Sequence, residues 1–114
     1  MPLTEHPADQ PLIIQAFSPG EIKINDQIYT ESIMLTTDFQ VLPWDGTNYE
    51  VLLQGQPELV LIGTGATQRF LSPALMALFY TRGIGVEVMT TAAAVRTYTV
   101  LTSENRKVGA GLIL

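Results

Sequence analysis

One short apolar run constrains this fold more than any other feature of the sequence. Residues 58–63 read ELVLIG, which is an unbroken apolar stretch of strand length after one glutamate. Such a run is typical of a strand covered on both faces, as in a parallel sheet that lies between layers of helices. Ser72 and Pro73 follow, and a serine before a proline favours the start of a helix. We therefore expect a strand–helix unit of an α/β fold.

The same alternation of strands and helices continues to residue 114. Apolar residues at helical spacing after Pro73 predict a helix that ends at Gly83 in a left-handed cap. Residues 84–89 (IGVEVM) predict the next strand, and a second helix is expected over residues 91–104. In residues 108–114, apolar side chains at every second position (Val108, Ala110, Leu112 and Leu114) predict a last strand. The predicted order is β-α-β-α-β, with at least one right-handed crossover.

The first third of the chain predicts a small antiparallel β meander. Its first strand is expected at residues 12–17 (LIIQAF). Residues 21–29 alternate in polarity around Asn25-Asp26, a pair that favours a two-residue hairpin turn. The meander is expected to continue through a strand at residues 31–36 (ESIMLT).

Residues 38–58 are predicted to be mostly connection. Thr47 and Glu50 have the spacing of a capping box, in which a hydroxyl and a carboxylate satisfy the first amides of a helix. A short helix is therefore expected at about residues 48–54. Trp44 and Tyr49 lie in this connection, where they either close over the core or form part of an exposed contact patch.

Length and composition predict one domain over residues 11–114, preceded by a flexible tail at residues 1–10. The sequence of 114 residues is 46% apolar and 15% charged, which suits a packed globule. It has no cysteine, which excludes disulfides and cysteine–zinc sites. The first residues resemble neither a secretory signal nor a transit peptide, and no apolar run is long enough to span a membrane. We therefore expect a cytoplasmic protein that does not insert into membranes.

The net charge of −5 is divided unevenly along the chain. Residues 1–62 hold nine acidic residues and one lysine, a net charge of −8, whereas residues 63–114 carry a net charge of +3. This asymmetry indicates an anion site in the basic half, an acidic outer face on the other half, or two solvated surfaces of one fold. The basic residues are few and do not alternate with aromatic residues, so nucleic-acid binding is not expected.

Three motifs carry a resemblance to a known family. They are LVLIGTGATQRFLSP (residues 59–73), RGIGVEVMTTAAAVRTY (82–98) and LTSENRKVGAGL (101–112), and they lie within residues 59–114, about half of the chain. On these motifs the chain resembles the Mth-like domain family, long known as a domain of unknown function. One residue departs from the family pattern, which usually has asparagine where this chain has Thr99. Any polar role of that position is therefore in question.

The resemblance implies a fold and a kind of function. It implies a three-layer α/β fold around a mixed central sheet, with the meander as an added β layer. It implies no known catalytic activity, because relatives with a known role include a mitochondrial factor that helps assemble respiratory complex I. The leading hypothesis is a non-catalytic domain, without cofactors, that binds another protein during complex assembly. Homodimer formation stays open.

The alternative hypothesis is a ligand-binding protein or an unrecognised enzyme. Open α/β sheets bind ligands at the carboxyl ends of their strands. The candidate residues for such a small-anion or small-ligand site are Gly63, Thr64, Gly65, Arg69, Glu87, Thr90, Arg96 and Arg106. The Gly-Thr-Gly loop lacks the third glycine of a dinucleotide fingerprint, where Gln68 stands, and it lacks the lysine of a P-loop.

Each of these candidates also has a purely structural interpretation. In that interpretation the glycines allow a positive φ or a close approach of two backbone segments, and the arginines pair with acidic residues. Glu87 lies between Val86 and Val88 and is expected to be half-buried with a hydrogen-bond partner. The only histidine is His6, so neither a catalytic triad nor a histidine metal site is expected.

Overall fold

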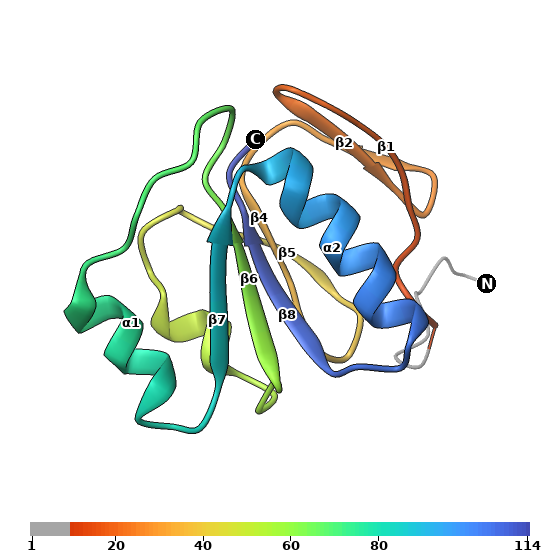
Figure 1. Ribbon diagram of the computed structural model, residues 1–114. Helices are drawn as coiled ribbons and strands as arrows, with labels where there is room; N and C mark the ends of the chain where they lie inside the picture. The colour runs from red at the N-terminus through yellow and green to blue at the C-terminus, as the bar shows by residue number, and fades with distance from the viewer. Residues whose placement is uncertain (1–9) are drawn as a thin grey trace.

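The computed structural model describes residues 10–114, so the predicted tail falls almost wholly outside the described residues, and His6 with it (Figure 1). The structure has two sheets, two α-helices and one short 3₁₀ helix. The elements in chain order are β1 (Ile14–Ser18), β2 (Glu21–Ile24), β3 (Gln27–Tyr29), β4 (Ile33–Leu35), β5 (Val41–Pro43), the 3₁₀ helix (Glu50–Leu53), β6 (Leu59–Gly63), α1 (Pro73–Tyr80), β7 (Gly85–Met89), α2 (Thr91–Ser103) and β8 (Val108–Leu112).

The larger sheet has five strands in the order β5-β4-β8-β6-β7. Strand β6 is parallel to both of its neighbours, β7 and β8, as the apolar run at residues 59–63 predicts. Strand β4 is antiparallel to both β5 and β8. The predicted mixed sheet and the α/β fold class are therefore confirmed.

The smaller sheet is an antiparallel meander of β1, β2 and β3. Asn25 and Asp26 form the predicted turn, with φ angles of 47° and 69°. Positive φ at both central residues gives the turn a twist that matches its strands. The prediction that residues 31–36 continue this meander is wrong, because β4 belongs to the larger sheet. All three residues of β4 are buried, and such a strand needs cover on both faces.

The connection contains less helix than the sequence predicts. The short helix is a 3₁₀ helix of four residues, and its N-cap position has no side-chain hydrogen bond. The predicted capping box does not form, because the Thr47 hydroxyl bonds the Asp45 carboxylate instead, at 3.1 Å. That carboxylate accepts from the backbone N–H groups of Thr47 and Asn48, both at 2.8 Å. These bonds hold the pKa of Asp45 below its usual value.

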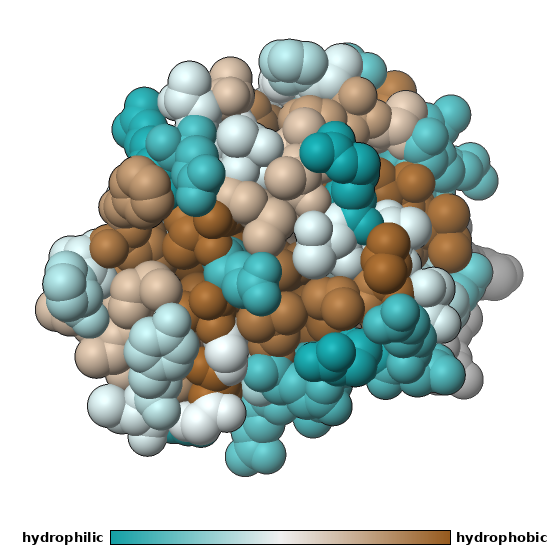
Figure 2. Space-filling view, in the orientation of Figure 1, coloured by the Kyte–Doolittle hydropathy of each residue, from teal (hydrophilic) through white to brown (hydrophobic). Residues whose placement is uncertain are grey.

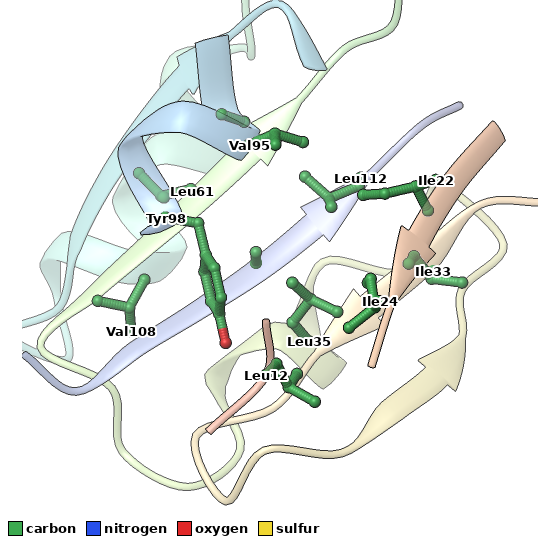
Figure 3. Close-up of a cluster of buried hydrophobic side chains, with 12 residues drawn as sticks. Leu12, Ile22, Ile24, Ile33, Leu35, Leu61, Val95, Tyr98, Val108 and Leu112 are labelled. Carbon is green, nitrogen blue, oxygen red and sulfur yellow. The ribbon is translucent and has the colours of Figure 1, made fainter. Parts of the chain in front are cut away.

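Both faces of the larger sheet are covered, which gives the three layers. Helix α2 and the small sheet lie on one face, and Figure 3 shows their shared core with Tyr98 of α2, Leu112 of β8 and Ile22 of β2. Helix α1 and the 3₁₀ helix pack on the other face around Phe79 and Leu52. The chain moves from β6 to β7 through α1, then back past β6 to β8 through α2. Two crossovers of the same hand therefore place the helices on opposite faces.

The indole of Trp44 packs against β8 at a glycine. A Cβ atom added to Gly111 would lie 2.9 Å from the ring carbon Cζ3 of Trp44. The indole is buried, and its N–H donates to the Asn48 carbonyl at 2.9 Å. The ring centroids of Trp44 and Tyr49 lie 5.8 Å apart in an edge-to-face arrangement. Trp44 therefore closes over the core rather than forming an exposed patch.

Helix ends follow their local signals. The hydroxyls of Ser72 and Thr90 accept from backbone N–H groups three residues later, at 3.2 and 3.3 Å. Gly83 and Asn105 follow the two helices with φ angles of 71° and 62°, which satisfy the left-handed cap. The predicted starts of both helices and the end of α2 are confirmed to within a residue, whereas α1 ends at Tyr80, three residues before Gly83.

Tyr98 carries the one buried side-chain polar atom without a hydrogen-bond partner in residues 10–114. Its ring is fully buried beneath α2, and in Figure 3 its hydroxyl points toward Leu12 and Leu35. Burial raises the pKa of Tyr98 to about 12. An unfolded tyrosine ionises near pH ~10, so the unfolded chain loses this proton first and the folded state loses stability as the pH rises from ~10 to ~12.

Replacing Tyr98 by phenylalanine tests this account. Tyr98→Phe should leave the free energy of unfolding at pH 7 unchanged or raise it, because no hydrogen bond is lost. At pH 11 the variant should gain about 1 kcal/mol relative to the parent chain. Urea denaturation at both pH values measures this, with the exposed Tyr80→Phe as the control. A loss above ~1 kcal/mol at pH 7 would mean that the hydroxyl has a partner.

Candidate functional site

The Gly-Thr-Gly loop begins where β6 meets the start of α2. A Cβ atom on Gly63 would lie 2.8 Å from the Thr91 hydroxyl and 2.9 Å from its Cα. Only glycine therefore lets the strand and the helix approach this closely. Gly65 has a φ of 93°, a backbone conformation that favours glycine. Both glycines have a structural explanation.

Two buried threonine hydroxyls form hydrogen bonds with backbone groups in and beside this loop. The Thr91 hydroxyl accepts from the Gly65 N–H at 2.8 Å and donates to the Ile113 carbonyl at 2.5 Å. The Thr64 hydroxyl accepts from the Arg69 N–H at 3.1 Å and donates to the Thr67 carbonyl at 2.8 Å. A phosphate site needs N–H groups that are free to point at the ligand. Here the N–H groups of Gly65 and Arg69 already have partners.

The charged candidates beside the loop lie on the surface. The side chains of Arg69, Glu87 and Arg96 are exposed, and none makes a hydrogen bond or ion pair with the rest of residues 10–114. The prediction that Glu87 is half-buried is wrong. Strand β7 is the edge of the sheet, and α2 lies mainly over β6 and β8, so the face that carries Glu87 stays open.

Arg106 lies away from the other candidates. It precedes β8, at the opposite end of the parallel strands from the loop after β6. Its Nε atom donates to the carboxylate of Glu58 at 2.8 Å, and both side chains are about half exposed. One ligand therefore cannot touch both Arg106 and the Gly-Thr-Gly loop. Thr90 is near the loop, but its hydroxyl caps α2.

The sequence contains no signal that β7 is an edge strand with unpaired backbone groups on its outer side. The Met89 carbonyl accepts from the N–H of Thr64, the residue after β6, so the Val88 carbonyl points the other way, away from the sheet. The Gln68 side chain donates to this carbonyl at 3.0 Å. Gln68 thus covers one polar group of the edge and holds the loop beside it. The other outward groups of β7 belong to Val86 and to the N–H of Val88.

Beside this edge, β7 and α2 form an open surface that we name the β7 shelf. The Thr97 hydroxyl contacts the Met89 sulfur at 3.6 Å, which places this side of α2 over β7. Residues three or four positions away share that side of the helix. The shelf consists of Glu87, Met89, Ala93, Arg96, Thr97 and Val100.

The shelf is partly apolar. The side chain of Val100 is 55% exposed, and in the neighbouring loop that of Phe70 is 86% exposed. Figure 2 views this side of the molecule and shows apolar side chains gathered across its middle, with polar ones among them. An exposed apolar surface with charged groups at its border is typical of a protein-binding site.

Thr99, the departure from the family pattern, has no hydrogen-bond partner outside its own helix among residues 10–114. Its hydroxyl donates to the Val95 carbonyl at 3.1 Å. Residues 10–114 contain no group of three or more metal-ligating side chains (His, Cys, Asp or Glu). In the same part of the chain, neither helix is both long and apolar enough to cross a membrane.

Comparison with known proteins identifies the family. Residues 14–113 match the model of a family described as "Protein of unknown function (DUF498/DUF598)". A crystal structure from Bordetella parapertussis is 32% identical, with a TM-score of 0.83, and the match covers 94% of this chain and 98% of that one. A Bordetella pertussis protein described as a Mth938-like domain is 25% identical over 99% and 92% of the two chains, with a TM-score of 0.76. The predicted family is therefore confirmed.

One relative carries a name that concerns its location. A Francisella tularensis subsp. holarctica protein is 26% identical to this chain over 123 residues, which cover 99% of both sequences. It is named "13 kDa major membrane protein". That name describes the relative only.

Replacing Thr91 tests whether its hydroxyl holds the loop together. Thr91→Val should lower the free energy of unfolding by about 1–3 kcal/mol, because the Gly65 N–H and the Ile113 carbonyl lose their partner. Thr91→Ser keeps the hydroxyl and should cost less. Thr99→Val is the control, because that hydroxyl only bonds within its helix. Equal stability of all three variants in urea denaturation would contradict the assignment.

Proposed function

Because this chain belongs to the DUF498/DUF598 family of unknown function, we propose its function from its surface: it is a non-catalytic domain that binds another protein through the β7 shelf. The observation that carries the proposal is the open β7 edge beside exposed apolar and unpaired charged side chains. The domain would act in the assembly of a larger complex.

The backbone of β7 supports binding of an extended segment. An added strand uses main-chain hydrogen bonds for affinity and side-chain contacts for specificity. Val86 offers its outward N–H and carbonyl, and the shelf supplies Val100 for apolar contact. Arg96 lies on the shelf and Arg69 lies in the adjoining loop, both unpaired, against the single carboxylate of Glu87. This charge balance favours a partner segment that carries acidic residues.

The small-anion alternative has less support. The loop N–H groups of Gly65 and Arg69 are used within the protein, and Arg106 lies at the other end of the sheet. What remains for an anion is Arg69 and Arg96, both exposed to water, where charge pairs contribute little. Protein binding would use the same arginines together with the exposed apolar surface of the β7 shelf.

Variants of the shelf test the proposed function. The tagged protein is crosslinked in its source cell, and captured partners are identified by mass spectrometry and then titrated as purified proteins. Arg96→Glu and Val100→Asp should each weaken the complex at least tenfold, about 1.4 kcal/mol, because each removes a contact and adds a repulsive or desolvated charge.

Leu42→Asp is the matched control for these shelf variants. Leu42 is 41% exposed on β5, at the other edge of the sheet, so this charge should leave the complex unchanged. A partner whose affinity is unaffected by both shelf variants would overturn the assignment of the shelf. Failure to recover any partner would count against the interaction itself.

We also propose that the domain acts in the cytoplasm. Fractionation of the source cell tests this, and most of the protein is expected in the cytoplasmic fraction, in the supernatant after ultracentrifugation. A known cytoplasmic protein and a known membrane protein serve as controls. Retention in the membrane pellet after a high-salt wash would contradict this location, in line with the name of the Francisella relative.

A further inference from the structure

Helix α1 has no charged side chain although it lies at the surface. Its eight residues read PALMALFY, and Tyr80 carries the only hydroxyl group among them. A helix that is apolar on every side is normally buried within a protein or a membrane. In α1 only Phe79 is buried, and Figure 1 shows the helix at the outside of the molecule, beside β7. Its outer side is therefore an apolar surface that no other part of residues 10–114 covers.

The exposed residues of α1 follow helical spacing. They are Pro73, Ala74, Ala77 and Tyr80, which we name the α1 face. Two small alanines lie at its middle, and the Tyr80 side chain at its end is 57% exposed. The loop that leads into the helix adds Phe70, which is 86% exposed. Aromatic side chains at the surface are typical of residues that contribute most to binding a partner.

The charges that border α1 are positive at both ends. Residues 59–86 contain Arg69 and Arg82 and no acidic residue. The guanidinium of Arg82 donates to the Leu78 carbonyl at 3.0 Å, which places its charge at the carboxyl end of the helix. Neither arginine forms an ion pair with another group of residues 10–114. An uncharged centre with arginine at the border is the composition typical of a protein interface.

The acidic residues nearest to this layer are directed elsewhere. Glu50 is on the 3₁₀ helix, which packs on β8, whereas α1 packs on β7, with β6 between those strands. Glu58 pairs with Arg106. Glu87 lies on β7 but on the opposite face of the sheet, since its neighbour Val86 packs in the core on the α1 side. The border of the α1 face therefore stays positive.

The α1 face offers side chains and not backbone groups to a partner. The N–H and carbonyl groups in the middle of a helix are bonded within it, so an added strand would gain no main-chain hydrogen bonds here. Small residues such as Ala74 and Ala77 allow a second helix to pack closely, because the distance between two helix axes depends on the side chains at the contact. Carboxylates at the border of that second helix would complement Arg69 and Arg82.

A second copy of this chain and a membrane surface both suit the α1 face less well. A symmetric contact between two copies would bring Arg82 close to its own counterpart or to Arg69, and residues 59–86 hold no carboxylate to offset these charges. An anionic membrane would attract the two arginines, but it would repel a chain whose net charge is −5.

We propose that the α1 face binds an amphipathic helix of another protein, in which acidic residues border the apolar side. This site goes beyond the proposed function, because α1 and the β7 shelf lie on opposite faces of the large sheet. It also uses another kind of contact, since the shelf lies beside a strand edge and the α1 face presents helix side chains.

A photo-crosslinking amino acid tests which molecule covers the α1 face. In the source cell, p-benzoylphenylalanine replaces Ala77 of the full chain, and the products of irradiation are identified by mass spectrometry. The expected product joins position 77 to a helix of another protein that carries carboxylates beside its apolar side. The matched control is the same replacement of Ala16, an exposed alanine on β1 of the small sheet, which should not give this product.

Charge variants of the purified chain then test how the crosslinked protein is recognised. Arg82→Glu should weaken its binding at least tenfold, because the new carboxylate faces the carboxylates of the partner. Arg82→Lys keeps the charge and should weaken binding by about threefold or less. Lys107→Glu changes the net charge by the same amount at a residue that precedes β8, and it should leave the affinity unchanged. Arg82 is used because Arg69 also borders the β7 shelf.

Several results would overturn this assignment. They are a product at position 77 that joins two copies of the chain, a product with lipid, the absence of any product, or a crosslinked protein that binds Arg82→Glu and Arg82→Lys equally well. Val100→Asp, on the shelf, should leave the product at position 77 in place. The α1 face and the β7 shelf are thus tested separately, and the failure of one site does not imply the failure of the other.

Discussion

The pairing of β8 on both of its sides is the constraint on which the rest of the structure depends. On one side β8 is antiparallel to β4, and on the other it is parallel to β6. Within the large sheet, β8 joins the antiparallel strands β4 and β5 to the parallel strands β6 and β7. All five of its residues are buried, and Gly111 gives room to the Trp44 ring. Because β8 occupies the centre of the sheet, β5 and β7 form its two edges.

Local signals account for the parts of the fold that the sequence predicts well. Ser72 and Thr90 cap helices through bonds to amides three residues away, so their effect needs only neighbouring residues. Strand partners are different, because pairing joins distant segments. Leu35 pairs with Ala110, 75 positions later. The residues near Leu35 suit a strand of either sheet. The prediction from sequence therefore places β4 in the wrong sheet.

In the candidate site, too, local features are predicted from sequence and features that depend on distant segments are not. The residue types of the Gly-Thr-Gly loop indicate a close approach, which Gly63 and Thr91 confirm. The exposure of Glu87 depends on which strand forms the edge and where α2 lies, and both are tertiary outcomes. The sequence was sufficient to predict that Arg106 lies far from the Gly-Thr-Gly loop. Arg106 precedes its strand and the loop follows a parallel strand, so the two lie at opposite ends of the sheet. The Gln68 bond to β7 has no sequence signal.

The strand order also has a consequence in time. Of the strands in residues 10–114, β8 is the last to be synthesised, yet it lies at the centre of the large sheet. At a translation rate of ~5–20 residues per second, β4 leaves the ribosome roughly 4–15 seconds before its partner exists. Through that interval the side chains of Ile33, Met34 and Leu35 have no sheet to enter. The large sheet therefore cannot be completed until β8 has been synthesised.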